Sequence, residues 1–196
     1  AITFTGPVVL THGGTVTVET AGAIGDNIVF NNTIDGGDSL VLNAGAANVT
    51  LIGEVGATTS VQSVDVTGAT ITADSVFTNA NQTYTASTGI VLTGNNYNAA
   101  AGDILFDGDT TLNLGIAGIV NVVGGGQVGH TVTFNGTVDA TLNREGLAIA
   151  AGAGEVVMAD AVGATNALAS FVVTSAGQVD LMNVRTVGVQ NVTGTN

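Results

Sequence analysis

Apolar and polar residues alternate along most of this chain in short runs, and turn-forming residues separate the runs. In Thr15-Val16-Thr17-Val18-Glu19, valines alternate with polar residues, which is typical of a strand with one buried and one wet face. Because such runs recur throughout, and Val, Ile and Thr favour strands while Gly, Asn and Asp favour turns, the sequence predicts an all-β protein of many short strands.

The predicted strands share this short, β-branched character. In the first half they are Ile2–Thr5, Thr15–Glu19, Ile28–Phe30, Ser39–Leu42, Val49–Ile52, Val64–Val66, Thr70–Thr72, Val76–Thr78, Thr83–Thr85 and Ile90–Leu92. In the second half they are Ile104–Phe106, Thr111–Leu114, Ile119–Val123, Val132–Phe134, Leu147–Ile149, Val156–Met158, Phe171–Thr174, Val179–Met182 and Val187–Val189. Residues 159–170 could also form a helix, but their counterpart in the first half contains Gly56, so we expect a loop.

The second half of the chain repeats the first in the same order. Ile2-Thr3-Phe4-Thr5-Gly6 matches Ile104-Leu105-Phe106-Asp107-Gly108, 102 residues on, and Val55-Gly56-Ala57-Thr58 matches Val162-Gly163-Ala164-Thr165, 107 residues on. The drift in offset is what small turn insertions produce, and one insertion is visible at 141–145. The repeat predicts two copies, 1–101 and 102–196, within one continuous β domain.

Two architectures accommodate such copies. In a parallel β-solenoid, coils of about 20 to 25 residues stack at about 4.8 Å and need few aromatic side chains. The alternative is two tandem immunoglobulin-like sandwiches of about 100 residues each, which usually contain a large central aromatic residue. The chain has no Trp, six Phe and a single proline, Pro7, with no Pro-rich linker between the copies. We therefore favour the solenoid.

Composition narrows the function. Charged residues make up 9% of the chain, and 15 acidic residues against Arg144 and Arg185 give a net charge of −13. This charge excludes nucleic-acid binding and disfavours anionic lipid, while the content of Val, Ile and Leu argues against disorder. No cysteine is present, so disulfides and thiol chemistry are absent, and no run of about 18 apolar residues exists to insert into a membrane. Ala1 does not begin a signal peptide, so we expect a mature chain or part of a longer one.

The candidate chemistry is sparse. Asp103, Asp107 and Asp109 form the densest acidic group and could supply oxygen ligands to Ca²⁺, although an ordinary Asp-Gly turn explains them as well. Asp35-Gly36-Gly37-Asp38 is a weaker case of the same kind, and His12 and His130 are interpreted as surface turn residues.

Since no nucleophile, paired carboxylate or phosphate loop has its partner residues, we expect no enzyme and no cofactor beyond that candidate Ca²⁺. Five Asn-x-Thr triplets, whose glycosylation is unknown, begin at Asn31, Asn48, Asn81, Asn135 and Asn191.

Three segments of the second copy carry a family resemblance. The stretches 131–139, 161–170 and 184–190 resemble the repeat region of large filamentous-haemagglutinin-like bacterial exoproteins, and 30–35, 55–63 and 82–84 follow the same plan. The resemblance implies a right-handed β-helix shaft on the outer surface of a Gram-negative bacterium, used in adhesion or biofilm formation. Its partners would be neighbouring repeats, other copies of itself, or glycans and proteins of a host or biofilm surface. A self-assembling subunit of an extracellular filament or sheath is the alternative.

Overall fold

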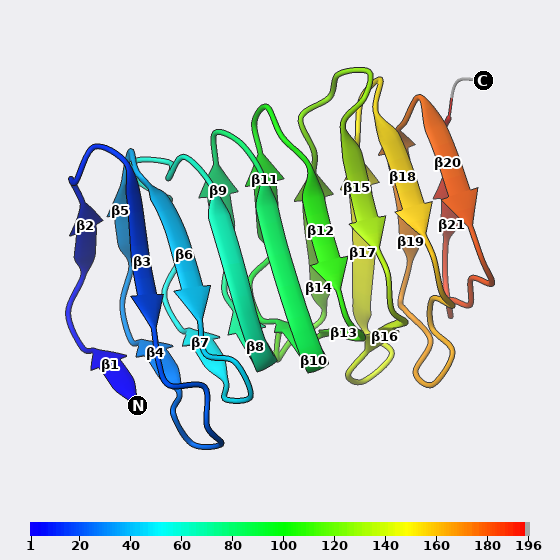
Figure 1. The fold of residues 1–196 in the computed structure, drawn as a ribbon. Coiled ribbons are helices and arrows are strands. Elements are labelled where there is room, and N and C mark those ends of the chain that lie inside the picture. Colours follow the sequence, from blue (N-terminus) through cyan, green and yellow to red (C-terminus); the bar gives the residue numbers. More distant parts are fainter. Residues whose placement is uncertain (195–196) are drawn as a thin grey trace.

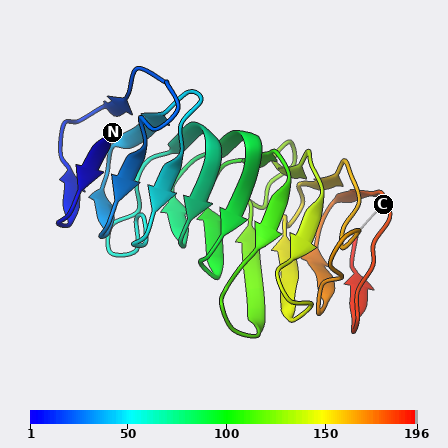
Figure 2. The ribbon, with the colours of Figure 1, turned by 90° about the horizontal axis from the view of Figure 1, so that it is seen from below.

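The chain winds into a parallel β-solenoid. A computed structural model describes residues 1–194, and the strands among them stack in parallel over about eight coils with no helix. Each coil contributes to three flat faces, and every ladder between coils is parallel. Figure 1 shows the coils stacked side by side from the N-terminus to the C-terminus, and Figure 2 shows the same stack from below. The predicted solenoid is confirmed, and the alternative of two antiparallel sandwiches is wrong.

The first face lies along the lower edge of the molecule in Figure 1. Its strands pair in coil order, and single bridges from Val138 to Val162 and from Val162 to Val184 extend it. It contains β1 (Ile2–Phe4), β4 (Ile28–Phe30), β7 (Val49–Leu51), the second part of β8 (Val64–Ala73), the second part of β10 (Gln82–Leu92), β13 (Thr110–Leu112) and β16 (Val138–Ala140).

The second face lies behind, with its strands running upward in Figure 1. Residue Val55 bridges Ile34 to Val76 where the third coil has no strand on this face. The face contains β2 (Val8–Leu10), β5 (Ile34–Gly36), β9 (Val76–Thr78), β11 (Asn96–Ala99), β14 (Gly118–Val123), β17 (Glu145–Ala150), β19 (Phe171–Ser175) and β21 (Gln190–Val192).

The third face is at the front, with its strands running downward. Strands β8 and β10 begin here and continue into the first face of the next coil, so they join the two faces into one sheet. The face contains β3 (Thr15–Glu19), β6 (Ser39–Asn43), the first parts of β8 and β10, β12 (Ile104–Asp107), β15 (Thr131–Phe134), β18 (Glu155–Met158) and β20 (Gln178–Leu181).

A narrow core fills the space between the faces. Because side chains alternate along a strand, equivalent inward positions form ladders from coil to coil, such as Leu40–Val64–Gln82–Ile104 on the third face. Gln82 is the polar member of this ladder, and its amide is satisfied by the Val76 carbonyl (3.1 Å) and the Tyr84 hydroxyl (3.0 Å). The core therefore continues without interruption through the middle of the stack.

Most predicted strands are present, with some differences. The predicted strands at 70–72, 83–85 and 90–92 are parts of the longer strands β8 and β10, because the corner between the third and first faces is nearly extended there. Five strands were missed, namely β2, β5, β11, β16 and β21, and four of them have only three residues. The prediction of a strand at 187–189 is wrong, since the strand begins at Gln190, whereas residues 159–170 form no helix, as expected.

The matching segments of the two halves occupy different faces. Strand β1 lies on the first face, whereas its counterpart β12 lies on the third; β6 is on the third and its counterpart β17 on the second. The local geometry is nevertheless the same, since Gly56 and Gly163 both have positive φ, 74° and 72°. Strands β10 and β12 pair across residues 101–102, so the stack continues there without a break.

Candidate functional surface

The three aspartates that could supply ligands to Ca²⁺ each contact the next coil. Asp103 Oδ1 accepts the Thr131 N–H at 2.8 Å, and Asp107 Oδ1 accepts the Asn135 side-chain amide at 2.9 Å. Asp109 Oδ1 accepts both the backbone N–H and the hydroxyl of Thr137, each at 3.0 Å. The structure thus uses all three to join coils.

These aspartates do not form one ligand set. Asp107 and Asp109 line the same shallow hollow of about 260 Å³, together with Ser87 and Thr88, whereas Asp103 does not line it. Within residues 1–194, no group of three His, Cys, Asp or Glu residues is arranged to hold a metal ion. Calcium binding by this segment stays a prediction.

Other aspartates join coils in the same way. Asp35 Oδ1 accepts the N–H groups of Thr58 and Thr59, at 2.8 and 3.0 Å. Its counterpart in the second half, Asp139, accepts those of Thr165 and Asn166, both at 2.9 Å. Both carboxylates satisfy backbone groups of a turn that contains a positive-φ glycine, which explains why aspartate and glycine recur together in the two halves.

Asp38, in the weaker of the two acidic segments, is almost completely buried. Its carboxylate accepts three backbone N–H groups of the preceding coil, from His12, Gly13 and Gly14. Since all three donors are amides of one turn, Asp38 holds that turn against the stack. The His12 residue itself is exposed, as a surface turn residue should be.

His130 has a partner that its sequence position does not reveal. Its Nδ1 lies 3.2 Å from Asp103 Oδ1, although the two residues are 27 apart in the chain. The stacking of one coil on the next brings them together. The sequence indicated only a surface turn residue at His130, and its contact with Asp103 is an addition to that interpretation.

Both arginines lie at the corner between the first and second faces and bind carbonyl groups of the preceding coil. Arg144 donates to the Gly115 carbonyl at 3.0 Å, and Arg185 donates to the Ala164 carbonyl at 3.1 Å. The positive charges of the chain are therefore placed along one corner.

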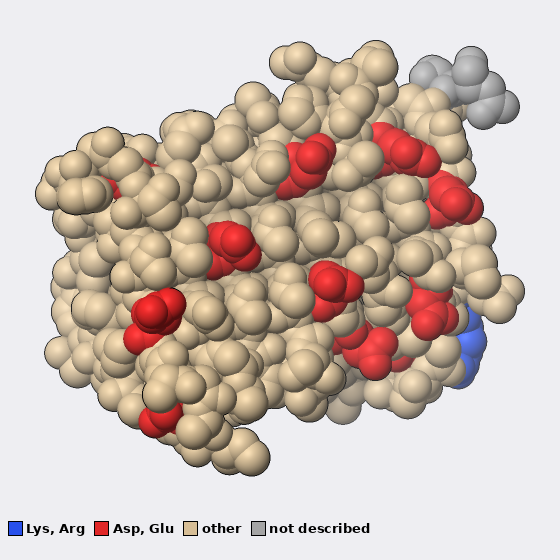
Figure 3. All heavy atoms as spheres, viewed as in Figure 1, with Lys and Arg blue, Asp and Glu red and all other residues tan. Residues whose placement is uncertain are grey.

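Acidic residues spread over the front of the molecule. Figure 3 shows the third face with scattered carboxylates, and basic atoms are visible only at its right-hand edge. Glu19, Asp65, Asp107 and Asp180 project outward from strands of this face. The ladder that contains two of them runs Thr17–Val41–Asp65–Thr83–Leu105–Thr133–Val157–Asp180, so hydroxyl and carboxylate groups are interspersed with aliphatic side chains on this face.

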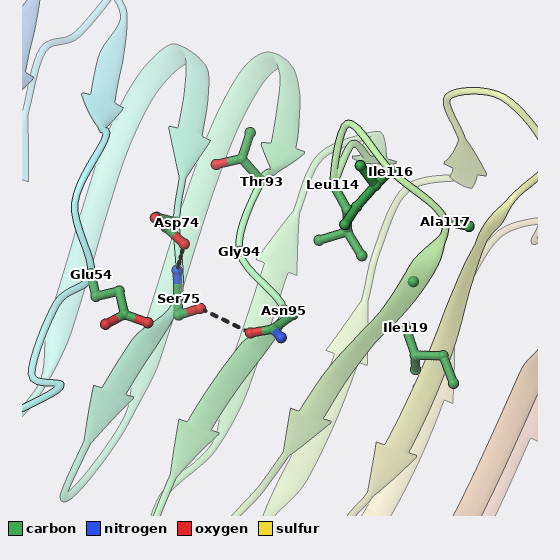
Figure 4. Close-up of a pocket in the computed structure, with 11 residues that line it drawn as sticks. Glu54, Asp74, Ser75, Thr93, Gly94, Asn95, Leu114, Ile116, Ala117 and Ile119 are labelled. Atoms are coloured by element: carbon green, nitrogen blue, oxygen red, sulfur yellow. Dashed lines mark hydrogen bonds between the residues drawn. The ribbon is translucent and has the colours of Figure 1, made fainter.

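A groove of about 360 Å³ runs across several coils at the corner between the first and second faces, and Figure 4 shows the side chains that line it. Its polar side is a row from three successive coils: Glu54 from the third, Asp74 and Ser75 from the fourth, and Thr93 and Asn95 from the fifth. Its apolar side comes from the sixth coil, with Leu114 and Ile116 in the loop after β13 and Ile119 near the start of β14.

The apolar side of the groove is held in place. Leu114 packs against the core, and the Asn113 N–H donates to the Leu92 carbonyl at 2.8 Å. Arg144 binds the loop at Gly115, and Arg144 belongs to the 141–145 insertion seen in the sequence. This insertion therefore braces the groove, a role that the sequence did not indicate.

Glu145 ends the insertion and is fully buried, since residues 145, 147 and 149 of β17 point inward. Its Oε2 accepts the Leu142 N–H at 3.3 Å, which closes the loop on itself. Its Oε1 accepts no hydrogen bond within the described part of the chain and lies 3.8 Å from Arg144 Nε.

Two tyrosines have strongly shifted acidities. Burial raises the pKa of Tyr84 well above its usual value, and the nearby Tyr97 adds to the effect. Burial also raises the pKa of Tyr97, and the charge of Asp74 adds to it. Both rings are fully buried, and each hydroxyl has a partner in the core, since Tyr97 donates to the Ala73 carbonyl at 2.6 Å and Tyr84 donates to Gln82 Oε1 at 3.0 Å.

The asparagines of the five Asn-x-Thr triplets are all exposed. Two of them join coils: Asn48 Oδ1 accepts the Thr70 N–H at 3.1 Å, and Asn81 Oδ1 accepts the Asp103 N–H at 3.0 Å.

No protein-family model matches the chain, and no curated protein or solved structure matches it either. None of the described residues forms a helix long and apolar enough to cross a membrane.

Proposed function

We propose that this chain is a rigid, non-catalytic shaft segment of a secreted bacterial surface protein with a role in adhesion. The observation that carries the proposal is that charged side chains along the stack bind the neighbouring coil. Asp35, Asp38, Asp109 and Asp139 accept its backbone amides, and Arg144 donates to the Gly115 carbonyl. Charged side chains that hold neighbouring coils together suit a rigid spacer rather than an enzyme.

The extracellular setting rests on the sequence. A chain with 9% charged residues and a net charge of −13 suits an exported repeat protein, and the resemblance to filamentous-haemagglutinin-like repeats points to a Gram-negative outer surface. In this proposal the partners are adjoining coils and the glycans or proteins of a host or biofilm surface.

Stiffness can be measured directly because the native chain has no cysteine. Thr17 and Asp180 are exposed on equivalent positions of the third face, in the first and eighth coils. Spin labels on a T17C/D180C variant should give a narrow distance distribution near 34 Å, from seven steps of about 4.8 Å. A distribution broader than that of a rigid control protein would contradict a shaft.

Adhesion needs a separate measurement. Beads coated with the 196-residue protein should bind biofilm or host-cell surfaces more than beads coated with an unrelated acidic protein of similar charge. Equal binding would remove the adhesive part of the proposal and leave the shaft.

A self-assembling filament subunit is the second candidate. In the first coil, β1, β2 and β3 pair on one side only, and the inward side chains of Phe4, Val8, Val16 and Val18 are only partly buried. Unpaired strand edges next to apolar side chains can accept another coil. Electron microscopy of the purified protein should show end-to-end filaments if this candidate is right, and separate short rods if it is not.

A further inference from the structure

The groove at the corner between the first and second faces joins two chemically different sides. On one side Ile116 is 70% exposed and Ile119 is 49% exposed, although Ile119 is held in β14 and the loop that carries Ile116 is fixed to the core and to Arg144. Covering such side chains would stabilise a complex by roughly 25 cal/mol per Å² of apolar surface removed from water. The loop thus offers a preformed contact rather than a mobile one.

The opposite side of the groove is negatively charged. Glu54 and Asp74 line it, and no Lys, Arg or His residue is among its lining residues. Glu54 is exposed and its carboxylate has no hydrogen-bond partner within residues 1–194, while Asp74 Oδ1 accepts the Ser75 N–H at 2.6 Å and keeps its second oxygen free of such bonds. A ligand complementary to this side carries a positive charge.

The spacing of the coils sets the length of the ligand. Glu54 belongs to the third coil and Ile116 to the sixth, so about three steps of 4.8 Å, or roughly 14 Å, separate them along the axis. An extended peptide advances about 3.3 Å per residue, and it would cross this distance in about four residues. Between the ends, the exposed Asn95 side-chain N–H groups can donate to a peptide carbonyl, and Thr93 Oγ1, which donates its hydrogen to the Ala73 carbonyl at 3.1 Å, can accept from a peptide N–H.

We propose that the groove binds an extended peptide segment that carries a basic side chain and, about four residues away, an apolar one. The basic group lies between Glu54 and Asp74, and the apolar group packs against Ile116 and Ile119. A peptide fits better than a glycan because the apolar side is wholly aliphatic, with no aromatic ring among the lining residues on which a sugar could stack. This inference rests on the adhesive part of the proposed function and names its partner.

The test is an NMR titration of the ¹⁵N-labelled full chain with an end-capped Lys-Gly-Ser-Gly-Leu peptide. We expect shifts confined to residues 54, 74–75, 93–95 and 114–119. E54Q should weaken binding by up to about fivefold, the range of an exposed ion pair. The double variant I116S/I119S should weaken binding by about tenfold or more. The unaltered protein should bind a Gln-Gly-Ser-Gly-Leu peptide as weakly as the E54Q variant binds the Lys-Gly-Ser-Gly-Leu peptide.

Two matched variants serve as controls. Ile24 is 93% exposed on another loop, and Glu19 is an exposed carboxylate on the third face, so I24S and E19Q should bind the peptide as the parent does. The proposal is overturned by unchanged binding in I116S/I119S, by equal binding of the glutamine peptide, or by shifts outside the groove. Concentration-dependent shifts without peptide would assign the groove to a second copy of the chain and would also overturn it. Each of these results leaves the T17C/D180C distance, and hence the shaft, unaffected.

Discussion

The ring of Phe106 stacks on the ring of Tyr84 one coil earlier, with centroids 5.1 Å apart and planes 7° from parallel. Phe134 stacks on the other side of Phe106 at 4.6 Å, and Tyr97 meets both Tyr84 and Phe106 edge-on. Four of the few aromatic residues in the chain therefore form one cluster in the middle of the stack, where they join three successive coils.

Replacing Phe106 with Leu should destabilise the protein by about 2 kcal/mol, because it removes two ring stacks, each worth about 1 kcal/mol, from a fully buried position. Urea unfolding followed by circular dichroism measures the change. Phe4→Leu is the control: Phe4 is stacked on one side only, against Phe30, and is partly buried, so its cost should be about half or less. Equal destabilisation by the two substitutions would show that the central aromatic cluster contributes no more to stability than the Phe4–Phe30 pair.

The buried tyrosines should make the protein sensitive to alkaline pH. Their folded-state pKa values are raised above the unfolded value near 10, so their contribution to stability is complete below about pH 10 and is lost as pH rises above it. The loss is about 1.4 kcal/mol per pH unit for each tyrosine. Tyrosinate absorbance should therefore appear together with the loss of β-sheet signal, and absorbance that appears well before unfolding would contradict the burial of these hydroxyl groups.

Removing a coil-joining carboxylate should be costly at both equivalent positions. Asp139→Ala leaves two backbone N–H groups of the next coil without their acceptor, as does Asp35→Ala, and each should cost about 1 to 2 kcal/mol. Asp180→Ala is the matched control, because Asp180 is exposed and its carboxylate makes no hydrogen bond among the described residues. Thermal unfolding of the three variants should show two similar decreases and one negligible change.

Two glycines with the same backbone conformation should respond differently to alanine. Gly163 and Gly115 both have φ +72°. A Cβ at Gly163 would lie 2.1 Å from the Arg185 carbonyl oxygen, whereas nothing lies within 4 Å at Gly115. Gly115→Ala should cost only the strain of its conformation, about 1 to 2 kcal/mol, and Gly163→Ala should cost clearly more because coils eight and nine must move apart. Similar melting temperatures would show that these coils are not closely packed.

Calcium can be tested at Asp107 and Asp109, which share a hollow. One oxygen of each already accepts a hydrogen bond from the next coil, so we expect millimolar Ca²⁺ to leave the melting temperature unchanged after EGTA treatment. A rise that the double variant D107N/D109N abolishes would instead establish the predicted site.

The sequence was sufficient to predict the stacking of parallel coils. The useful signals were local features of the sequence: the alternation in segments such as 15–19, the lack of Trp and the regular turn residues. Local features suffice because a solenoid is built from contacts between neighbouring coils. Three-residue strands such as β2 and β5 escaped prediction because a period of two needs a longer run to be recognised.

The groove and the His130–Asp103 contact could not be predicted because they depend on which residues of successive coils lie side by side. Coil length varies, from Ile71–Ile90 to Thr110–Val138 between successive first-face partners, so no fixed spacing in the sequence marks a contact. Ile116 lies in the run Leu114-Gly115-Ile116-Ala117-Gly118-Ile119, where two glycines interrupt an apolar stretch, and this interruption was the available signal.

Each segment of the second half lies four coils and two faces further along the stack than its match in the first half. This offset has a consequence for any longer array built in the same way. Each further copy would turn its surface features by another third of a revolution, so that a given loop would point in three directions in succession. Such a rod would offer the same contact to partners on all sides of its axis rather than along a single line.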